Sequence, residues 1–514
     1  MNGARSLVET LVAAGVDTCF ANPGTSEMHF VAALDQHAGI RCVLGLQENV
    51  VTGMADGYFR IAGRPACTLL HCGPGLANGL ANLHNARRAR SGIVNIVGDQ
   101  ATYHRPHDPP LTADTEGFAR AVSGWVRTST RSSEVGREAA AAVQAARTYP
   151  GQVATLILPA DASWEEGGAV AQPLSVPAPP PLAPQAVDAA ARMLRSHGSK
   201  TLLLLAGAAV QAEGQALAWR IAQATGAHLM ADFVNAKVAR GRGRLQVERV
   251  PYKSELALQA LARFEHIVLV NAKAPVGFFA YPGLPSIQYP RDAQLHVLSP
   301  PEQDAVAALR ALADALHAPA APMPDPGPRP EPATGAPSSD KLAQTVAALM
   351  PENAIVSDES VSYGRGFYRN SHAAPPHDWL HLAGGAIGDG LPVATGAAIG
   401  AGGQRRVIGL QADGSAMYSL QALWTQARER LPVTTILLNN RKYDILLGEY
   451  KGVGATPGPT AHRMLDLADP DLDWVRIAGG LGVEAARATT MEECAELMVR
   501  SFRSDGPFLV ELMV

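Results

Sequence analysis

The residue types best suited to chemistry lie in the stretch QADGSAMYSLQALWTQARERLPVTTILLNN, Gln411–Asn440. The acidic turn Asp413-Gly414-Ser415 follows one apolar run, and the pair Asn439-Asn440 follows the next. A carboxylate beside an amide oxygen forms a hard oxygen site, which suits Mg²⁺ because this ion usually completes its shell with phosphate oxygens and water. Gly414 would let the backbone approach a diphosphate, and Ser415 is placed to cap a helix whose positive end favours anions. The pattern predicts a metal-anchored diphosphate, and the alternative is two polar loop ends at a sheet edge.

Parallel strands must position these side chains, because Asp413 and Asn440 can meet only if the two preceding apolar runs are neighbouring strands. Ligands of such sheets bind beyond the carboxyl ends of the strands. Short apolar runs alternate with helical patterns along the whole chain, which favours parallel sheets covered on both faces. The predicted strands are Thr18–Phe20, Cys42–Leu46, Ala66–Leu70, Ile93–Val97, Val153–Leu158, Thr201–Leu205, His266–Val270, His296–Leu298, Ala354–Val356, Arg406–Leu410, Val433–Leu438 and Phe508–Leu512.

Two proline-rich passages, Ala169–Pro184 and Ala318–Asp340, divide the 514 residues. Both contain too much proline for the interior of a helix or sheet, so they indicate linkers. They leave a first block (1–168), a middle block (185–317) and a third block (338–514), each of ordinary domain size. The prediction is an α/β protein of three doubly wound parallel-sheet domains.

Composition excludes several classes of protein. The chain is 47% hydrophobic and 18% charged, with a net charge of only -4, so nothing favours binding to nucleic acid or to a membrane surface. The amino terminus lacks the apolar core of a signal peptide, and no apolar run is as long as a transmembrane helix. Five cysteines, an odd number without a C-x-x-C pair, indicate a reducing compartment. We therefore expect a cytoplasmic protein.

Several motifs occur together in one order. They are NPGTSE (22–27), QENVVTGMADGYFRIAGRPA (47–66), GGAIGDGLP (384–392) and the D-G-S and N-N pair, in which Ala412 replaces an expected glycine. In this order the chain resembles the thiamine diphosphate-dependent decarboxylase and acetohydroxyacid synthase superfamily. It is most similar to benzoylformate decarboxylase and to acetolactate synthase-like proteins. The resemblance implies that the blocks are a pyrimidine-binding, a central and a diphosphate-binding domain.

The same resemblance implies roles for individual residues around a cofactor that carries the difficult chemistry. Glu48 would activate the pyrimidine ring, the carbonyl of Gly385 would accept a hydrogen bond from it, and Ile387 would support its bent conformation. The implied cofactor-binding residues are Glu48, Gly385, Ile387, Asp413, Gly414, Ser415, Asn440 and Tyr443, and the implied Mg²⁺ ligands are Asp413, Asn440 and the main-chain oxygen of Lys442. The alternatives are that Glu48 is a first-turn helix glutamate favoured by the dipole and that Ile387 packs into a buried turn.

On the substrate side, the resemblance implies a hydroxyl from Thr25 and an acid–base group in His71, since histidine exchanges protons near neutral pH. The alternative for His71 is a strand-end histidine bonded to the backbone. The family's second histidine is missing, because the stretch 274–283 contains Phe278, Phe279 and Tyr281 instead. This departure argues against a copied proton relay.

His381 is expected in the pocket as a further catalytic residue. The roles of His104, His107 and Glu449 stay open, and either histidine could be an exposed loop residue. Together His381 and Glu449 indicate a substrate more polar than benzoylformate.

The resulting hypothesis is a thiamine diphosphate- and Mg²⁺-dependent, non-oxidative decarboxylase or carboligase of a small 2-oxo acid. The alternatives are an acetolactate synthase-type transferase and a non-catalytic subunit with the same fold. A nicotinamide enzyme would need a glycine fingerprint, and the middle block has only the loose turn Leu205–Gly214, so we expect no FAD there either. In the family each site lies between two subunits, which implies a homodimer or homotetramer.

Overall fold

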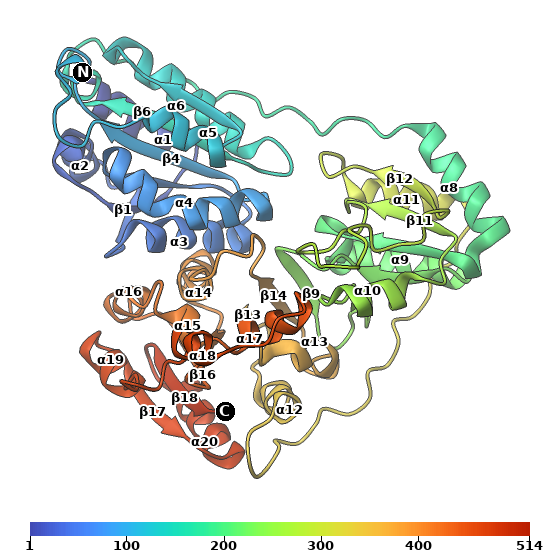
Figure 1. Cartoon of the computed structure of the whole chain (residues 1–514). Coiled ribbons are helices and arrows are strands. Elements are labelled where there is room, and N and C mark those ends of the chain that lie inside the picture. The colour runs from blue at the N-terminus through green and yellow to red at the C-terminus, as the bar shows by residue number, and fades with distance from the viewer.

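The computed structural model describes residues 1–514, except for the side chains of Arg365 and Tyr368. Three units follow one another along the chain, each built on one sheet with helices on its faces (Figure 1). The predicted α/β class of parallel sheets is confirmed. Within the described chain, no helix combines the length and the apolar character that crossing a membrane requires.

The first unit holds a six-stranded sheet in which every strand pair is parallel. Successive residues of its strands face opposite sides: Phe20 lies in one apolar core and Cys19 in the other, so both faces are covered. In order across the sheet, the strands are β2 (Arg41–Leu44), β1 (Thr18–Asn22), β3 (Ala66–Leu70), β4 (Ile93–Asp99), β6 (Val153–Pro159) and β5 (Trp125–Thr128). The helices are α1 (Gly3–Ala13), α2 (Met28–Asp35), α3 (Glu48–Ala62), α4 (Cys72–Ala89), α5 (Thr115–Val122), α6 (Ser132–Arg147) and α7 (Ala160–Trp164).

The middle unit has a five-stranded sheet built around the apolar strand β7. Its strands, in order, are β10 (Glu248–Arg249), β8 (His228–Ala231), β7 (Thr201–Leu205), β11 (His266–Val270) and β12 (Gln294–Ser299). Its helices are α8 (Pro184–His197), α9 (Ala212–Thr225), α10 (Ser254–Leu261) and α11 (Ala305–Ala315). The strand β9 (Lys237–Arg240) leaves this unit and pairs antiparallel with the third sheet, which the sequence did not indicate.

The third sheet has seven strands and carries the predicted metal site at the carboxyl ends of its central strands. In order these are β17 (Glu484–Ala488), β18 (Phe508–Met513), β16 (Val433–Asn439), β15 (Val407–Ala412), β13 (Ile355–Glu359), β14 (His377–His381) and β9. The helices are α12 (Ser339–Leu349), α13 (Phe367–Asn370), α14 (Gly390–Gly400), α15 (Asp413–Ala416), α16 (Ala422–Arg428), α17 (Asp444–Gly452), α18 (Pro459–Leu465), α19 (Trp474–Gly480) and α20 (Met491–Phe502). Five 3₁₀ turns complete the chain: η1 (Thr25–Glu27), η2 (Arg105–His107), η3 (Gly198–Lys200), η4 (Gly207–Val210) and η5 (Gly364–Gly366).

The first and third units meet through α3 and α14, which pack with almost no space between their backbones. A Cβ atom on Gly57 would lie 2.2 Å from the carbonyl oxygen of Val393, and one on Gly396 would lie 1.9 Å from that of Met54. Glycine is therefore required at both positions. The buried Arg60 of α3 pairs with Asp56 and donates to the carbonyl of His381 at 2.7 Å, which ties α3 to the end of β14.

Both proline-rich passages form long connections, one between α7 and α8 and one between α11 and α12 (Figure 1). We propose domain boundaries at these connections, giving domains 1–168, 185–317 and 338–514.

Candidate functional site

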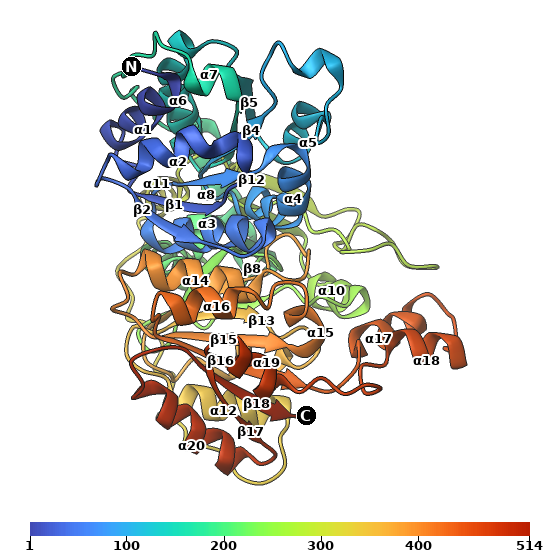
Figure 2. The same ribbon diagram turned by 90° about the vertical axis from the view of Figure 1, so that its left-hand side faces the viewer.

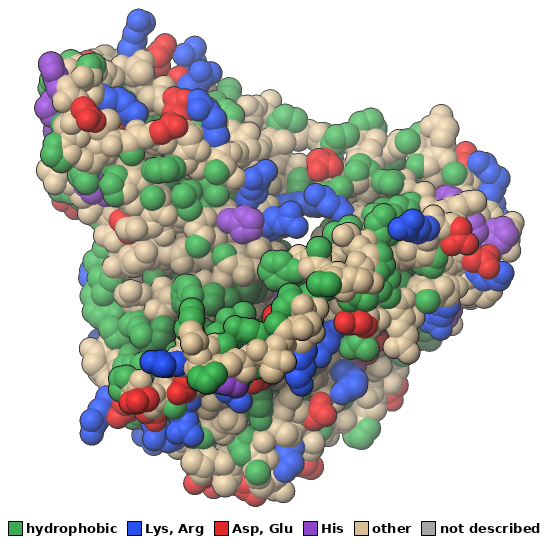
Figure 3. Space-filling view, viewed as in Figure 1, with side chains coloured by type: hydrophobic (Ala, Val, Ile, Leu, Met, Phe, Trp, Pro, Cys, Tyr) green, Lys and Arg blue, Asp and Glu red, His purple; other side chains and the backbone are tan. Residues whose placement is uncertain are grey.

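A cavity of about 650 Å³ opens at the carboxyl ends of β13, β15 and β16 and extends toward the middle unit. Most of the residues that the sequence singled out line it: His381, Gly385, Ile387, Asp413, Gly414, Ser415, Asn440, Lys442, Tyr443 and Glu449. Exposed apolar side chains surround its mouth, and in Figure 3 green side chains gather around the hollow between the middle and third units.

Asp413 and Asn440 follow the paired strands β15 and β16, whose ends lie in register at Ala412 and Leu438. Asp413 is 2% exposed, and its carboxylate accepts the backbone N–H groups of Gly414 at 2.8 Å and Arg441 at 2.7 Å. Burial raises the pKa of Asp413, and these backbone hydrogen bonds oppose the rise. The carboxylate is thus fixed at the cavity wall.

The two asparagines of the motif have different environments. Asn439 is buried and donates to Glu511 at 2.7 Å, whereas Asn440 lines the cavity and accepts the N–H of Lys442 at 3.1 Å. Arg441 has a left-handed φ of 56°, and its N–H donates both to Asp413 at 2.7 Å and to Oδ1 of Asn439 at 3.1 Å. The side chain of Asn439 is thus held between Glu511 and this N–H, and of the two asparagines only Asn440 lines the cavity.

Gly414 and Ser415 belong to the one-turn helix α15, which begins at Asp413 instead of after Ser415 as expected. The ring of Tyr443 covers Gly414, because a Cβ atom there would lie 2.5 Å from Tyr443 Cε1. Ser415 accepts a hydrogen bond from Gln411 at 2.7 Å. Glycine thus permits the close approach of an aromatic ring to the turn.

The Gly384–Gly390 loop is held rigidly from two sides. Asn85 of α4 donates to the carbonyl of Ala386 at 2.8 Å and accepts its N–H at 3.1 Å. The buried Glu359 accepts the N–H groups of Gly388 at 2.7 Å and Gly390 at 2.9 Å. Burial raises the pKa of Glu359, and these N–H groups oppose the rise. The sequence did not point to Glu359 or Asn85, because nothing local connects them to the loop.

His381 lies at the end of β14, buried against the cavity. Burial lowers the pKa of His381 well below its usual range, and the nearby guanidinium groups of Arg249, Arg240 and Arg60 act in the same direction. The imidazole is therefore neutral at pH 7.

Glu48 and His71 lie elsewhere, at the carboxyl edge of the first sheet. Among the residues that the structure describes, neither they nor Thr25 belong to the cavity lining. Glu48 begins α3 and accepts a hydrogen bond from Asn78 at 3.1 Å. Glu48 and His71 flank Gly75, where a Cβ atom would lie 3.1 Å from Glu48 Oε1 and 3.3 Å from His71 Cβ. The two predicted proton-handling groups are neighbours, but in this chain they are separate from Asp413.

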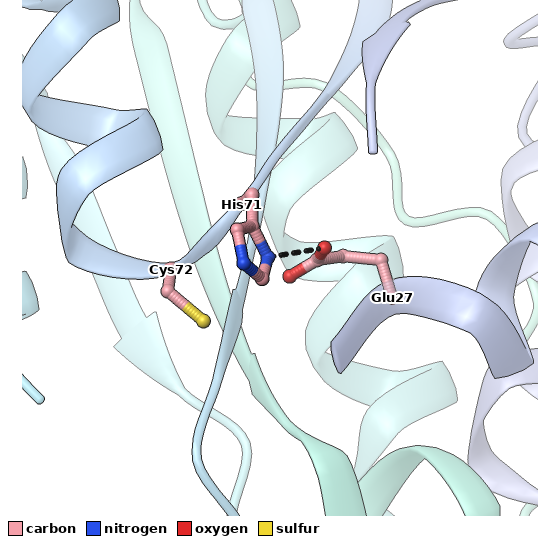
Figure 4. A group of neighbouring side chains, drawn as sticks. All are labelled: Glu27, His71 and Cys72. Atoms are coloured by element: carbon pink, nitrogen blue, oxygen red, sulfur yellow. Dashed lines mark hydrogen bonds and ion pairs between the residues drawn. The ribbon is translucent and has the colours of Figure 1, made fainter. Parts of the chain in front are cut away.

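Three side chains surround His71 in a compact cluster: Ser26, Glu27 and Cys72. Figure 4 shows Glu27 hydrogen-bonded to the imidazole ring. His71 Nδ1 lies 2.8 Å from Glu27 Oε2, and Ser26 Oγ lies 3.3 Å from the same nitrogen and 3.1 Å from Cys72 Sγ. Glu27 is 3% exposed and also accepts the N–H of Gly24 at 2.8 Å. Burial raises the pKa of the Cys72 thiol to about 11.

The sequence identified Thr25 of this segment, but Thr25 is exposed, and the neighbours that contact His71 are Ser26 and Glu27. His104, which precedes η2, and His107 within it are both exposed, with ring centroids 6.3 Å apart, and they lie outside the described cavity lining. The tight turn after β1, in which Glu27 bonds back to Gly24, was the available signal for a fixed carboxylate.

Comparison with known proteins agrees with this arrangement. Residues 1–118 match the thiamine pyrophosphate enzyme, N-terminal TPP binding domain, and residues 362–512 match the corresponding C-terminal TPP binding domain. The chain is 50% identical over 517 residues to the "Putative acetolactate synthase large subunit IlvX" of Mycobacterium tuberculosis, covering 100% of this chain and 99% of that protein. It is 30% identical over 530 residues to benzoylformate decarboxylase of Pseudomonas aeruginosa, covering 97% and 96%.

Among solved structures, the thiamine diphosphate-dependent 4-hydroxybenzoylformate decarboxylase of Rhodococcus jostii RHA1 superposes with a TM-score of 0.85 at 26% identity. The match covers 99% of this chain and 98% of that one. The motifs, the three parallel-sheet units and the two matched binding domains all agree, and the chain therefore belongs to the family of thiamine diphosphate-dependent enzymes.

Proposed function

We propose that this enzyme decarboxylates a small 2-oxo acid without oxidation, using thiamine diphosphate and Mg²⁺, and releases the product or transfers it to an acceptor. The observation that carries the proposal is the convergence of Asp413, Asn440 and the Gly384–Gly390 loop on one cavity with apolar walls. An acetolactate synthase-type transfer is the second candidate, favoured by the name of the relative at 50% identity. A non-catalytic subunit is disfavoured, because it has no physical reason to keep a buried carboxylate aimed at the cavity.

The residues present fit both the metal and the diphosphate. Asp413, Asn440 and the carbonyl of Lys442 offer the hard oxygen atoms that Mg²⁺ prefers, and all three residues line the cavity. The turn at Gly414 and Ser415 would receive the diphosphate, with Tyr443 covering it. On the other side, Gly385 with φ 82° and Ile387 would support the rings. We propose no FAD site in the middle domain.

When bound, the cofactor supplies a carbon nucleophile and holds the electron pair that decarboxylation releases. The residues of this chain would move protons and orient the substrate. Glu48 would hold the proton that the pyrimidine ring exchanges, His71 would donate or accept a proton at the substrate, and Thr25 or Ser26 would bind the substrate carboxylate. His381, which is neutral, would contribute an N–H or a lone pair instead of a charge.

Because Glu48, His71 and Thr25 are outside the cavity formed by their own chain, we propose that a second copy supplies them. The exposed apolar side chains at the rim support this proposal, since exposed patches of this kind mark protein interfaces. They include Phe279 at 58%, Leu446 at 43% and Met464 at 74% exposure. Figure 2 shows α17 and α18 standing out from the third unit. We propose a homodimer, or a homotetramer formed by two such dimers.

All five cysteines are free thiols, which supports the proposed reducing, cytoplasmic compartment. The function as a whole is tested by incubating the holoenzyme with aliphatic, aromatic and charged 2-oxo acids and measuring carbon dioxide and ligated products. Carbon dioxide without ligation supports a decarboxylase, ligated products support a carboligase, and neither product from any acid contradicts the proposal.

Replacing Asp413 with Ala is expected to lower the affinity for Mg²⁺ and thiamine diphosphate by at least about 10-fold, because a hard oxygen ligand is lost. Isothermal titration of the apoenzyme measures both affinities. Asp413→Asn is the comparison variant: it removes the charge but keeps one acceptor oxygen, which can still bind the Arg441 N–H, whose bond measures 2.7 Å. Affinities equal to wild type in the Ala variant would show that Asp413 is a structural residue of the turn.

Glu27→Gln is expected to lower kcat by about 10-fold, because His71 loses the carboxylate that fixes its Nδ1 and thereby the orientation of its ring. Cofactor affinity and KM are expected to stay near wild type, and Glu27→Asp should restore part of the rate. Glu138→Gln, which changes another largely buried carboxylate of the first domain, is the control. A kcat within about 2-fold of wild type in Glu27→Gln would contradict the role.

A further inference from the structure

The cavity continues from the cofactor-binding side to a wall of aromatic rings supplied by the middle domain. Phe278, Tyr252 and Phe233 contact one another, with ring centroids 5.6 Å apart for Tyr252 and Phe278 and 5.5 Å apart for Phe233 and Tyr252. Phe278 reaches the loop beside the cofactor position, because a Cβ atom on Gly385 would lie 2.7 Å from its Cζ. A substrate bound there would therefore lie against an aromatic wall.

At the far end of this wall, a single carboxylate is held by two tyrosines. Glu449 of α17 accepts the hydroxyl of Tyr281 at 2.6 Å on Oε2 and that of Tyr252 at 3.3 Å on Oε1. Tyr281 fits closely against α17, since a Cβ atom on Gly452 would lie 2.9 Å from its ring. Burial raises the pKa of Tyr281, and the hydrogen bond to Glu449 adds to the rise, so this hydroxyl stays protonated as a donor.

We propose that Glu449 determines specificity by binding the distal end of the substrate, and that this enzyme prefers 2-oxo acids whose distal end carries a cationic or hydrogen-bond-donating group. This inference rests on the proposed function and adds the substrate class to it. The aromatic wall would hold the ring or carbon stem of such a substrate, and Glu449 would receive its amino, guanidino or hydroxyl group.

The preference for a donor at the distal end of the substrate follows from the hydrogen-bonding groups at this end of the cavity. An ionised carboxylate only accepts hydrogen bonds, and the two tyrosine hydroxyls leave it further lone pairs that face the cavity and can receive a donor from the substrate. A distal carboxylate would be repelled there. Arg249 lies over the ring of Phe233 at 5.3 Å and lowers the pKa of His381, which places this positive charge on the His381 side of the same cavity.

Four phenylglyoxylates that share one ring test the inference, with hydrogen, hydroxyl, aminomethyl or carboxylate at the para position. For the wild-type holoenzyme, kcat/KM is expected to be highest for aminomethyl, then hydroxyl, then hydrogen, and lowest for carboxylate. Glu449→Gln should lower kcat/KM for the aminomethyl substrate by about 10–100-fold and change the unsubstituted one by less than about 3-fold. Glu496→Gln, an exposed helical glutamate outside the described cavity lining, should leave all four values unchanged.

Binding of the corresponding para-substituted mandelates, which are not decarboxylated, gives a second readout by calorimetry on the holoenzyme. Tyr281→Phe keeps the carboxylate and removes one anchor, so it should weaken the aminomethyl preference by only a few-fold. If Glu449→Gln does not fold, this variant carries the test, and an unchanged preference in it contradicts the inference.

Two results would overturn the role of Glu449 while leaving the proposed function intact. One is that the para-carboxylate compound binds or reacts best, and the other is that Glu449→Gln affects all four compounds equally. If no 2-oxo acid reacts at all, the proposed function fails, and the mandelate affinities still decide whether Glu449 selects a donor.

Discussion

Glu48→Gln is expected to lose most of its turnover, by about 10²–10⁴-fold, while it still binds thiamine diphosphate and Mg²⁺. Glutamine has nearly the same size and can keep the hydrogen bond with Asn78, which measures 3.1 Å in the wild type. It cannot exchange a proton with the pyrimidine ring. The change should therefore remove a chemical step without altering the proposed cofactor-binding residues, Asp413 and the Gly384–Gly390 loop.

Single-turnover kinetics and calorimetry separate the two effects. The expected result is a rate reduced by the stated factor with cofactor affinity within a few-fold of wild type. Glu134→Gln, another first-turn helix glutamate of the first domain, is the matched control and should react at the wild-type rate. If Glu48→Gln reacts within a few-fold of wild type, Glu48 is only a helix residue stabilised by the dipole.

The positions of Asp413 and Asn440 were predictable because they depend on short-range patterns. The runs Arg406–Leu410 and Val433–Leu438 are recognisable strands, and the rule that ligands bind at carboxyl ends of parallel strands gives Asp413 and Asn440 at once. The strand ends gave Asn440 as the neighbour of Asp413, and the resemblance gave its role as a Mg²⁺ ligand. In the structure, Asn439 is the last residue of β16 and bonds to Glu511, whereas Asn440 follows the strand and lines the cavity.

The polar contacts that hold the site were not predictable, because each joins residues far apart in the chain. Asn85 and Ala386 come from different domains, and so do Glu449 and Tyr281. The strand β14, with the sequence HDWLH, has too much polar character to be recognised, and β9 joins the third sheet through its pairing with β14. Pairing over such sequence separations depends on the completed fold and leaves no local pattern.

Because Glu48 lies outside the cavity of its own chain, we expect two damaged variants to restore activity when their subunits mix. A chain with Glu48→Gln keeps Asp413 and Asn440, the proposed metal ligands, and a chain with Asp413→Ala keeps Glu48. If each site combines Glu48 of one chain with Asp413 of the other, a mixed dimer contains one doubly damaged site and one undamaged site. At a cofactor concentration that saturates the wild-type site but not the Asp413→Ala site, both preparations are expected to lose most of their activity and to regain part of it after subunit exchange.

Random exchange of equal amounts should make half of the dimers mixed, with one working site in each, so about a quarter of wild-type activity should return. Pairing of dimers into tetramers leaves this fraction unchanged.

The double variant Glu48→Gln/Asp413→Ala mixed with either single variant is the control, because no combination of those chains contains an undamaged site. If native mass spectrometry shows mixed dimers while activity stays at the level of the separate variants, Glu48 and Asp413 do not act across a subunit interface. Glu48 would then have to reach the cofactor within its own chain, although it lies outside the described lining of that chain's cavity. The close α3–α14 contacts at Gly57 and Gly396 hold the first and third units of one chain together, so this separation favours the two-chain site as the physical explanation.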